Sequence, residues 1–72
     1  MQKYQRIRDL REDKELKQID IAKILNTTQK QYSRWETGEY PVPFETIIKL
    51  ARIYDVSIDY IAGLTNDKRK FW

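Results

Sequence analysis

The 72-residue chain contains no cysteine and no histidine. Without thiols it can form neither disulfides nor thiolate metal sites, and without imidazole it lacks the usual general base near neutral pH. The acidic residues Asp9, Glu12 and Asp13 share one face of a helical segment, but a Ca²⁺ site normally needs a looped set of oxygen ligands. We therefore expect no enzymatic activity, no cofactor and no metal site.

Long apolar runs are also missing from the sequence. A bilayer-spanning helix would need about 18 or more consecutive apolar residues, and a secretory signal would show an apolar segment soon after the N-terminus. Glycine and proline occur only twice each, so neither a glycine-rich phosphate loop nor a long flexible linker is expected. These absences predict a cytoplasmic protein without a membrane partner.

The composition that remains is that of a small folded domain. Hydrophobic residues make up 40% of the chain and charged residues 35%, which provides enough apolar material for a core. A chain of this length holds one domain with a thin core. The net charge of +3 is compatible with a nucleic-acid partner without requiring one, so the positions of the charges must decide.

Apolar residues recur at spacings of three and four, and this pattern indicates helices rather than strands. It predicts an all-α domain over residues 1–65 and a basic, aromatic C-terminal tail over residues 66–72. Tyr4 is expected in the first helix, Leu16 as a core anchor after it, and Phe44 on the apolar face of the fourth helix. Helices are predicted over about 4–12, 18–25, 28–37, 44–54 and 58–62.

Local signals predict where these helices begin and end. Asn26 follows the second helix, and Asn is a residue that tolerates the left-handed conformation at a helix C-terminus. The sequence Thr28-x-x-Gln31 matches the capping box, in which each side chain accepts a hydrogen bond from an otherwise unpaired backbone N–H. Gly38 and Gly63 are expected to end the third and fifth helices.

The helix predicted over residues 28–37 separates into two faces. At about 100° per residue, Tyr32 and Trp35 lie together and are expected to face the core. Glu36 falls at the edge of that face, where an unpaired carboxylate would be unfavourable, so it should have a cationic partner. Four polar residues are expected to face outward, namely Lys30, Ser33, Arg34 and Thr37.

Two helices of about eight residues, joined by a three-residue turn, form the arrangement that places a helix in the DNA major groove. A specific set of residues accompanies this arrangement: Gln18, Ala22, the Thr27-Thr28 turn, Glu36, Gly38 and the later run IIKLARIYDVSIDYIAGLT. In these features the sequence resembles the helix-turn-helix domains of the Cro and phage-repressor family. The resemblance covers about residues 4–65 and implies a five-helix, lambda-repressor-like DNA-binding domain.

The resemblance also implies which residues would read DNA bases. Gln29, Lys30 and Arg34 match base-reading positions, which agrees with the pairing of Gln with adenine and of Arg with guanine. Ser33 is shorter and is a weaker candidate for a base contact. Thr28 matches a position that often meets a phosphate or a thymine methyl group.

Other residues are expected to brace this helix or to contact the DNA backbone. In the resemblance, Gln18 would bind a phosphate and brace the reading helix, and Arg11 would form a buried or half-buried ion pair with Glu36. Lys17 stands where the family commonly has Ser or Thr, so this helix cap is expected to be about 1 kcal/mol poorer. The remaining expected phosphate contacts come from Lys17, Thr37 and Tyr40. Tyr40 could instead cover a hydrophobic edge.

These expectations predict a sequence-specific double-stranded DNA-binding transcriptional regulator, expected to be a repressor. It would act as a homodimer on a pseudo-palindromic operator, without a small-molecule ligand. The dimer surface is expected in the C-terminal tail or around the fifth helix, at Val56, Ile58, Tyr60 and Leu64. The alternative is a protein-binding module, such as an antitoxin or antirepressor, marked by exposed Ile19, Ile24 and Trp72. We expect, however, that the two isoleucines only thicken the core.

Overall fold

Five short helices form the regular structure of the computed structural model, which describes residues 5–68. They are α1 (Gln5–Asp13), α2 (Gln18–Ile24), α3 (Gln29–Thr37), α4 (Phe44–Tyr54) and α5 (Ile58–Ala62). Every regular element within the described residues is a helix, so the predicted all-α class is confirmed. No helix in this part of the chain has the length and apolar character needed to cross a membrane. The predictions for Tyr4 and for residues 69–72, including Trp72, lie outside the described residues.

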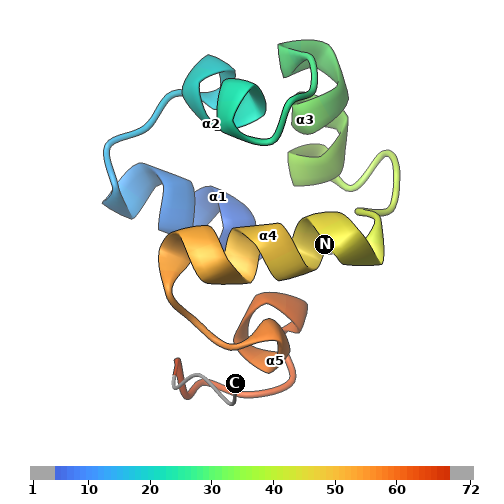
Figure 1. Ribbon diagram of the computed structural model, residues 1–72. Helices are drawn as coiled ribbons and strands as arrows, with labels where there is room; N and C mark the ends of the chain where they lie inside the picture. Colours follow the sequence, from blue (N-terminus) through green and yellow to red (C-terminus); the bar gives the residue numbers. More distant parts are fainter. Residues whose placement is uncertain (1–4, 69–72) are drawn as a thin grey trace.

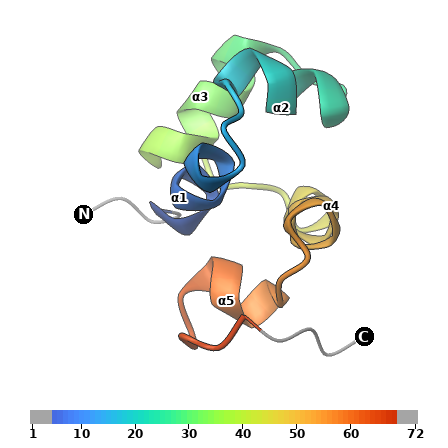
Figure 2. The same cartoon turned by 90° about the vertical axis from the view of Figure 1, so that its left-hand side faces the viewer.

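The helices are arranged as two ends joined by a middle layer. In Figure 1, α2 and α3 lie at one end, α5 lies at the other, and α1 and α4 lie between them. Figure 2 shows the same order from the side, with α1 and α4 next to each other in the middle. Helix α1 packs against both α3 and α5, while α2 packs against α3 and α4 against α5. Helix α1 therefore links the end that carries α3 to the end that carries α5.

The core lies where the inner faces of the helices meet. Ile7, Ile21, Tyr32 and Leu50 come from four different helices, and each is fully buried. Leu16, predicted to anchor the connection after α1, is partly buried against them, which confirms that prediction. Within residues 5–68, the buried hydrophobic residues are Ile7, Leu10, Ile21, Ala22, Leu25, Tyr32, Trp35, Val42, Ile47, Leu50, Ala51, Tyr54, Val56 and Ile61. Because α3 contributes Tyr32 to this core, its inner face is fixed.

A residue with positive φ follows each of the five helices. These residues are Glu15 (57°), Asn26 (59°), Gly38 (82°), Asp55 (59°) and Gly63 (81°). The predictions for Asn26, Gly38 and Gly63 are confirmed. The sequence pattern did not predict Glu15, because a residue of this type has no special preference for the left-handed conformation. After Glu15, the N–H of Leu16 donates to the carbonyl of Arg11 at 3.1 Å, a hydrogen bond that closes the end of α1.

The two isoleucines expected to thicken the core lie on the surface, so that prediction is wrong. Ile19 is 37% exposed and Ile24 is 56% exposed. The buried face of this segment consists of Ile21, Ala22 and Leu25. At about 100° per residue, Ile19 and Ile24 lie roughly 110° to either side of the centre of that face. The core ends before it reaches either side chain, and the two lie on opposite flanks of α2.

Two other predictions about apolar residues are also wrong. Phe44, expected on the apolar face of α4, is 65% exposed, because it is the first residue of the helix and lies beyond the core. Val56, expected at a dimer surface, is only 3% exposed, because the chain turns inward after the left-handed Asp55. The other candidates for that surface are the partly buried Ile58 and Tyr60 and the exposed Leu64.

The segment that follows α5 packs back onto α1 and α5. Arg6 donates from Nη1 to the carbonyl of Tyr60 at 2.9 Å and from Nη2 to Asn66 Oδ1 at 2.6 Å. The guanidinium carbon of Arg6 also lies 4.3 Å from the centre of the Tyr60 ring, in cation–π range. Further along, the N–H of Ser57 donates to the carbonyl of Lys68 at 3.2 Å. Arg6 therefore ties the start of α1 to α5 and to the segment that follows it.

Candidate nucleic-acid interface

A tight turn connects α2 to α3 and sets the direction of α3. After the left-handed Asn26, the N–H of Thr27 donates to the carbonyl of Ala22 at 2.9 Å. Thr28 is extended, and its Oγ1 accepts a hydrogen bond from the N–H of Gln31 at 3.1 Å. The Thr28 half of the predicted capping box is thus present. This geometry begins α3 directly after the turn, as a helix-turn-helix arrangement requires.

The inner face of α3 is held by its two aromatic residues. Tyr32 is fully buried and Trp35 is 5% exposed. Their rings meet edge to face, with centroids 6.3 Å apart and an angle of 80° between the ring planes. Such a pair contributes about 0.5–1.5 kcal/mol beyond the burial of its surface. These contacts fix the rotation of α3 about its own axis and so determine which side chains face outward.

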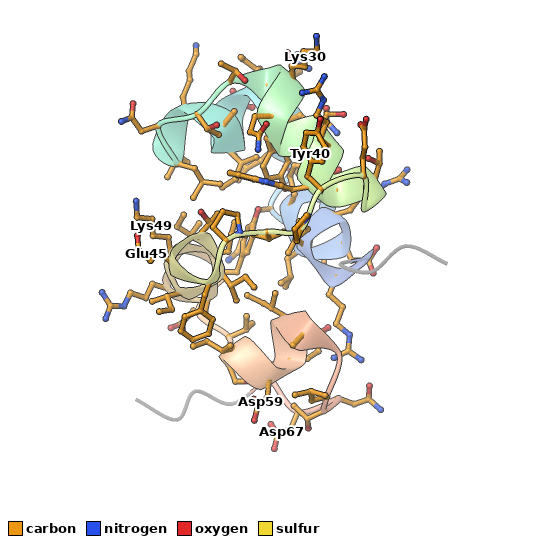
Figure 3. The ribbon with its side chains drawn as sticks, turned by 90° about the vertical axis from the view of Figure 1, so that its right-hand side faces the viewer. Lys30, Tyr40, Glu45, Lys49, Asp59 and Asp67 are labelled. Carbon is orange, nitrogen blue, oxygen red and sulfur yellow. The ribbon has the colours of Figure 1, made fainter. Side chains whose placement is uncertain are left out.

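A groove runs between the start of α2 and the outer face of α3. The residues that line it are Gln18, Gln29, Lys30, Ser33, Arg34 and Glu39. Four of the five residues predicted to contact bases therefore lie together, and the fifth, Thr28, caps α3. Figure 3 shows Lys30 at the end of the molecule formed by α2 and α3. The groove presents hydrogen-bond donors from several long side chains to one surface.

Gln18 lies between this groove and a second, smaller cleft. The second cleft is lined by Arg8, Arg11, Gln18, Glu36 and Thr37. Gln18 donates a hydrogen bond from Nε2 to Glu36 Oε1 at 3.2 Å. Because one amide hydrogen is used in this way, the second hydrogen and the carbonyl oxygen remain for another partner. Gln18 therefore connects the first residue of α2 to α3, as expected of a bracing residue.

Arg11 and Glu36 form an ion pair between α1 and α3. Arg11 Nε lies 2.6 Å from Glu36 Oε2, and Arg11 Nη2 lies 3.3 Å from Glu36 Oε1, so the contact is bidentate. The side chains are 13% and 3% exposed, respectively. Arg11 also donates from Nη1 to the carbonyl of Leu16 at 2.7 Å. The structure thus brings together the two residues that the resemblance pairs.

This environment changes the acidity of the Glu36 carboxyl group. Burial by itself would raise its pKa, but Arg11, through its hydrogen bond and its positive charge, together with the neighbouring Tyr32 and Gln18, outweighs burial and lowers the pKa from its ordinary value of 4.5. The hydrogen bond to Glu36 likewise raises the pKa of Arg11. Both groups are therefore held in their charged forms, and Glu36 acts as a structural anion.

The lowered pKa of Glu36 predicts a pH dependence of stability. The contribution of Glu36 should be fully present above pH 4.5, its ordinary pKa, and should be lost as the pH falls through the lower pKa of the folded state. We expect the stability difference between the wild type and Glu36→Gln, measured by urea unfolding, to shrink as the pH is lowered through that range. A difference that stays constant with pH would contradict the assignment.

Two buried tyrosines lie near this pair and belong to the core. Burial raises the pKa of Tyr32, and the neighbouring Glu36 carboxylate raises it further. Burial also raises the pKa of Tyr54 to about 12. The hydroxyl groups of both tyrosines are enclosed without a hydrogen bond of ordinary geometry. They stay protonated at physiological pH and contribute packing rather than a reactive phenolate.

The three residues expected to contact phosphates from outside the groove occupy different places. Lys17 is exposed at the N-terminus of α2, where its N–H donates to Asp20 Oδ2 at 2.9 Å. Thr37 is exposed in the last turn of α3 and donates from Oγ1 to the carbonyl of Arg34 at 3.2 Å. Tyr40 lies in the loop after α3 and is 42% exposed. The Asp20 carboxylate supplies half of a capping box that the sequence pattern did not predict.

Glu39 is the residue of the groove that sequence reasoning missed. Its Oε2 lies 3.7 Å from Arg34 Nε, and its side chain is 58% exposed. A signal was present in the sequence, because Gly38 was expected to turn the chain left-handed at the end of the helix. Such a turn directs the next residues back along the last helical turns, where an acidic residue can meet Arg34.

Comparison with known proteins identifies similar sequences. A family model described as helix-turn-helix matches residues 7–61. The uncharacterized HTH-type transcriptional regulator YobD of Bacillus subtilis (strain 168) is 38% identical over 63 residues, covering 88% of this chain and 56% of YobD. The uncharacterized HTH-type transcriptional regulator YqaE of the same organism is 33% identical over 63 residues, covering 86% of this chain and 54% of YqaE. The chain thus spans about half the length of these relatives. No solved structure matches.

Proposed function

This chain belongs to the helix-turn-helix family, and on that basis we propose that it is a sequence-specific DNA-binding transcriptional regulator that reads the major groove with α3. The observation that carries the proposal is the groove beside α3, where Gln29, Lys30 and Arg34 lie together. Gln can pair with N6 and N7 of adenine, and Arg with O6 and N7 of guanine. The names of the two relatives, both HTH-type transcriptional regulators, support the same function.

The rigidity of α3 supports this proposal. A reading helix must be held firmly, because base contacts depend on the position of each side chain to within about 0.5 Å. In this protein α3 is fixed by Tyr32 in the core, by the ion pair from Arg11 and by the hydrogen bond from Gln18. The inner face is thus occupied by structural contacts, and the outer face is available for DNA.

The proposal includes repression and binding as a homodimer. A single reading helix makes few base contacts, so tight specific binding is expected to need two copies on a pseudo-palindromic site. Within the described residues, the exposed Leu64 and the partly buried Ile58 and Tyr60 form the proposed dimer surface at the α5 end. This end lies opposite α2 and α3 in Figure 1. Occupation of a promoter by such a dimer would be sufficient for repression.

Selection of bound sequences from a random double-stranded DNA pool tests the proposed function. We expect enrichment of a pseudo-palindromic sequence with half-sites about 10 base pairs apart, or a multiple of that spacing. The double variant Lys30→Ala, Arg34→Ala should enrich a different sequence or none, because both side chains line the groove. Failure of the wild-type protein to enrich any sequence would contradict the proposal.

A second candidate function is a protein-binding module, such as an antitoxin or antirepressor. It is favoured by the exposure of Ile19 and Ile24, which are 37% and 56% exposed on α2. In this case Lys30→Ala combined with Arg34→Ala would leave the biological activity unchanged, whereas Ile24→Ser would abolish it. A DNA-reading regulator is expected to show the opposite result.

The cap of α2 leads to a prediction that separates stability from DNA affinity. Lys17→Thr should stabilise the free protein by about 1 kcal/mol, because Thr accepts hydrogen bonds from the first backbone N–H groups of a helix and Lys does not. If Lys17 contacts a phosphate, the same change should reduce the slope of log K against log[salt] by about one unit. Thermal melting and binding titrations at several salt concentrations measure the two effects. An unchanged slope would rule out the phosphate contact.

A further inference from the structure

The loop after α3 folds back against the residue that is proposed to read guanine. Gly38 has φ of 82°, and beyond it the N–H of Tyr40 donates to the carbonyl of Arg34 at 3.3 Å. A left-handed residue at this position reverses the chain, and Gly adopts it without steric cost. The two residues after Gly38, which are Glu39 and Tyr40, are thereby placed beside the Arg34 side chain.

Both of these residues contact the guanidinium group of Arg34. Glu39 Oε2 lies 3.7 Å from Arg34 Nε. The guanidinium carbon of Arg34 lies 5.1 Å from the centre of the Tyr40 ring, which is within cation–π range. As a result, the Arg34 side chain is only 32% exposed, although it lies on the outer face of α3. Two residues of the loop therefore contact Arg34 before any DNA is bound.

We propose that Glu39 is a positioning residue that determines how strictly Arg34 discriminates guanine, an inference that rests on the proposed reading of the major groove by α3. Glu39 approaches the guanidinium at Nε. The two terminal amino groups can then face O6 and N7 of guanine, because a guanidinium offers donors along more than one edge. Glu39 and a guanine can therefore hold Arg34 at the same time.

The charge of Glu39 explains why it would favour discrimination over affinity. A carboxylate in a DNA-binding groove is repelled by the phosphates, so on its own it weakens binding to every sequence. Glu39 also pairs with the guanidinium of Arg34, which would otherwise be free to contact the nearest phosphate. Restricting the Arg34 side chain to one conformation reduces the conformational entropy that is lost when Arg34 binds the correct base. The result is weaker non-specific binding and a larger difference between guanine and the other bases.

The test compares Glu39→Gln with the wild type on the DNA sequence selected by the wild type. The guanine that Arg34 reads is identified with 7-deazaguanine, which lacks the N7 acceptor. It is the position at which replacing guanine by 7-deazaguanine weakens binding of the wild type but not of Arg34→Ala. At that position, 7-deazaguanine should weaken wild-type binding about tenfold and Glu39→Gln binding less than about threefold. Binding of Glu39→Gln to unrelated DNA should at the same time become tighter than that of the wild type.

Glu45→Gln is the control for the loss of one negative charge. Glu45 lies in the first turn of α4, away from Lys30 in Figure 3 and outside the proposed dimer surface. Glu45→Gln should keep the wild-type response to 7-deazaguanine, and Glu39→Gln should keep the wild-type melting temperature. In an Arg34→Ala background, Glu39→Gln should no longer change the response, because the residue it positions is absent.

Two results would overturn the inference in different ways. If the wild type selects a DNA sequence and Glu39→Gln tightens binding to all DNA while keeping the tenfold response, Glu39 only repels phosphates and does not position Arg34. If the wild type selects no sequence, the proposed function fails and the positioning role fails with it. The first result leaves the proposed function intact, so the two failures are distinguishable.

Discussion

Glu36→Leu is expected to lower the free energy of unfolding by about 3–5 kcal/mol, because it leaves the guanidinium of Arg11 buried without its carboxylate. Arg11 is 13% exposed and Glu36 is 3% exposed, so water can replace little of the lost interaction. Gln18 loses an acceptor in the same variant. For a domain of this size, such a loss is a large part of the total stability.

A double-mutant cycle measures the coupling free energy between Arg11 and Glu36 separately from the contribution of each residue alone. Arg11→Met alone should also be strongly destabilising, whereas the combination with Glu36→Leu should cost clearly less than the sum of the two single changes, because no buried charge is left unpaired. The measurement is the urea midpoint and slope of all four proteins. Additive losses would show that the two side chains do not act as a pair.

The ion pair of Arg8 and Glu12 on α1 provides a matched control. Its N–O distance is 3.5 Å, but the two side chains are 47% and 54% exposed. Exposed pairs of this kind contribute about 0–1 kcal/mol. The cycle Arg8→Met and Glu12→Leu should therefore show a coupling well below that of Arg11 and Glu36. Equal coupling in the two cycles would mean that burial does not strengthen the pair of Arg11 and Glu36.

Replacing Lys30 and Arg34 by Ala should strongly weaken binding to the selected DNA sequence. Each good contact with a base edge discriminates by about 1–3 kcal/mol, so the double variant is expected to lose about 30-fold to about 20,000-fold in affinity. Its melting temperature should change little, because both side chains lie on the outer face of α3 and line the groove. Titration of labelled DNA at fixed salt concentration measures the loss.

Lys49→Ala, on α4, is the control for the removal of positive charge. In Figure 3, Lys49 lies beside Glu45 at the left of the view, away from Lys30 at the top. The substitution should weaken binding only slightly and to the same extent for all sequences. If Lys49→Ala matched the effect of Arg34→Ala, the binding surface would not be the groove beside α3.

The order of the helices could be predicted because local signals and apolar spacing agree along most of the chain. Asn26, Thr28 and Gly38 each carry a backbone preference that appears directly in the sequence, and the structure contains all three features. Tyr32 and Trp35 share one helical face, and both are buried. Residues of this kind reveal their role through their own chemistry and spacing.

The width of the core could not be predicted in the same way. Ile19 and Ile24 are apolar, but whether a flank of α2 is covered depends on how far the neighbouring helices extend, which the spacing within α2 does not contain. The same holds for Phe44, which has the spacing of the apolar face of α4 but is the first residue of the helix and lies outside the core cluster. Burial at the edge of a small core is a property of the packed helices together.

The contacts of the groove were predictable only in part. The angular position of Arg34 on α3 indicated that it faces outward, but its neighbours come from a loop whose path depends on Gly38 and on the hydrogen bond from Tyr40. Glu39 therefore could not be assigned to Arg34 from helical spacing. The placement of Lys17 beside Asp20 also required the structure.

The most direct test of the central claim is methylation interference on the selected DNA sequence. Methylation of guanine at N7 blocks the major groove, whereas methylation of adenine at N3 blocks the minor groove. We predict that N7 methylation within each half-site prevents binding of the wild type and that Arg34→Ala loses this sensitivity at one guanine. Interference at adenine N3 alone, or an unchanged N7 pattern for Arg34→Ala, would contradict the reading of the major groove by α3.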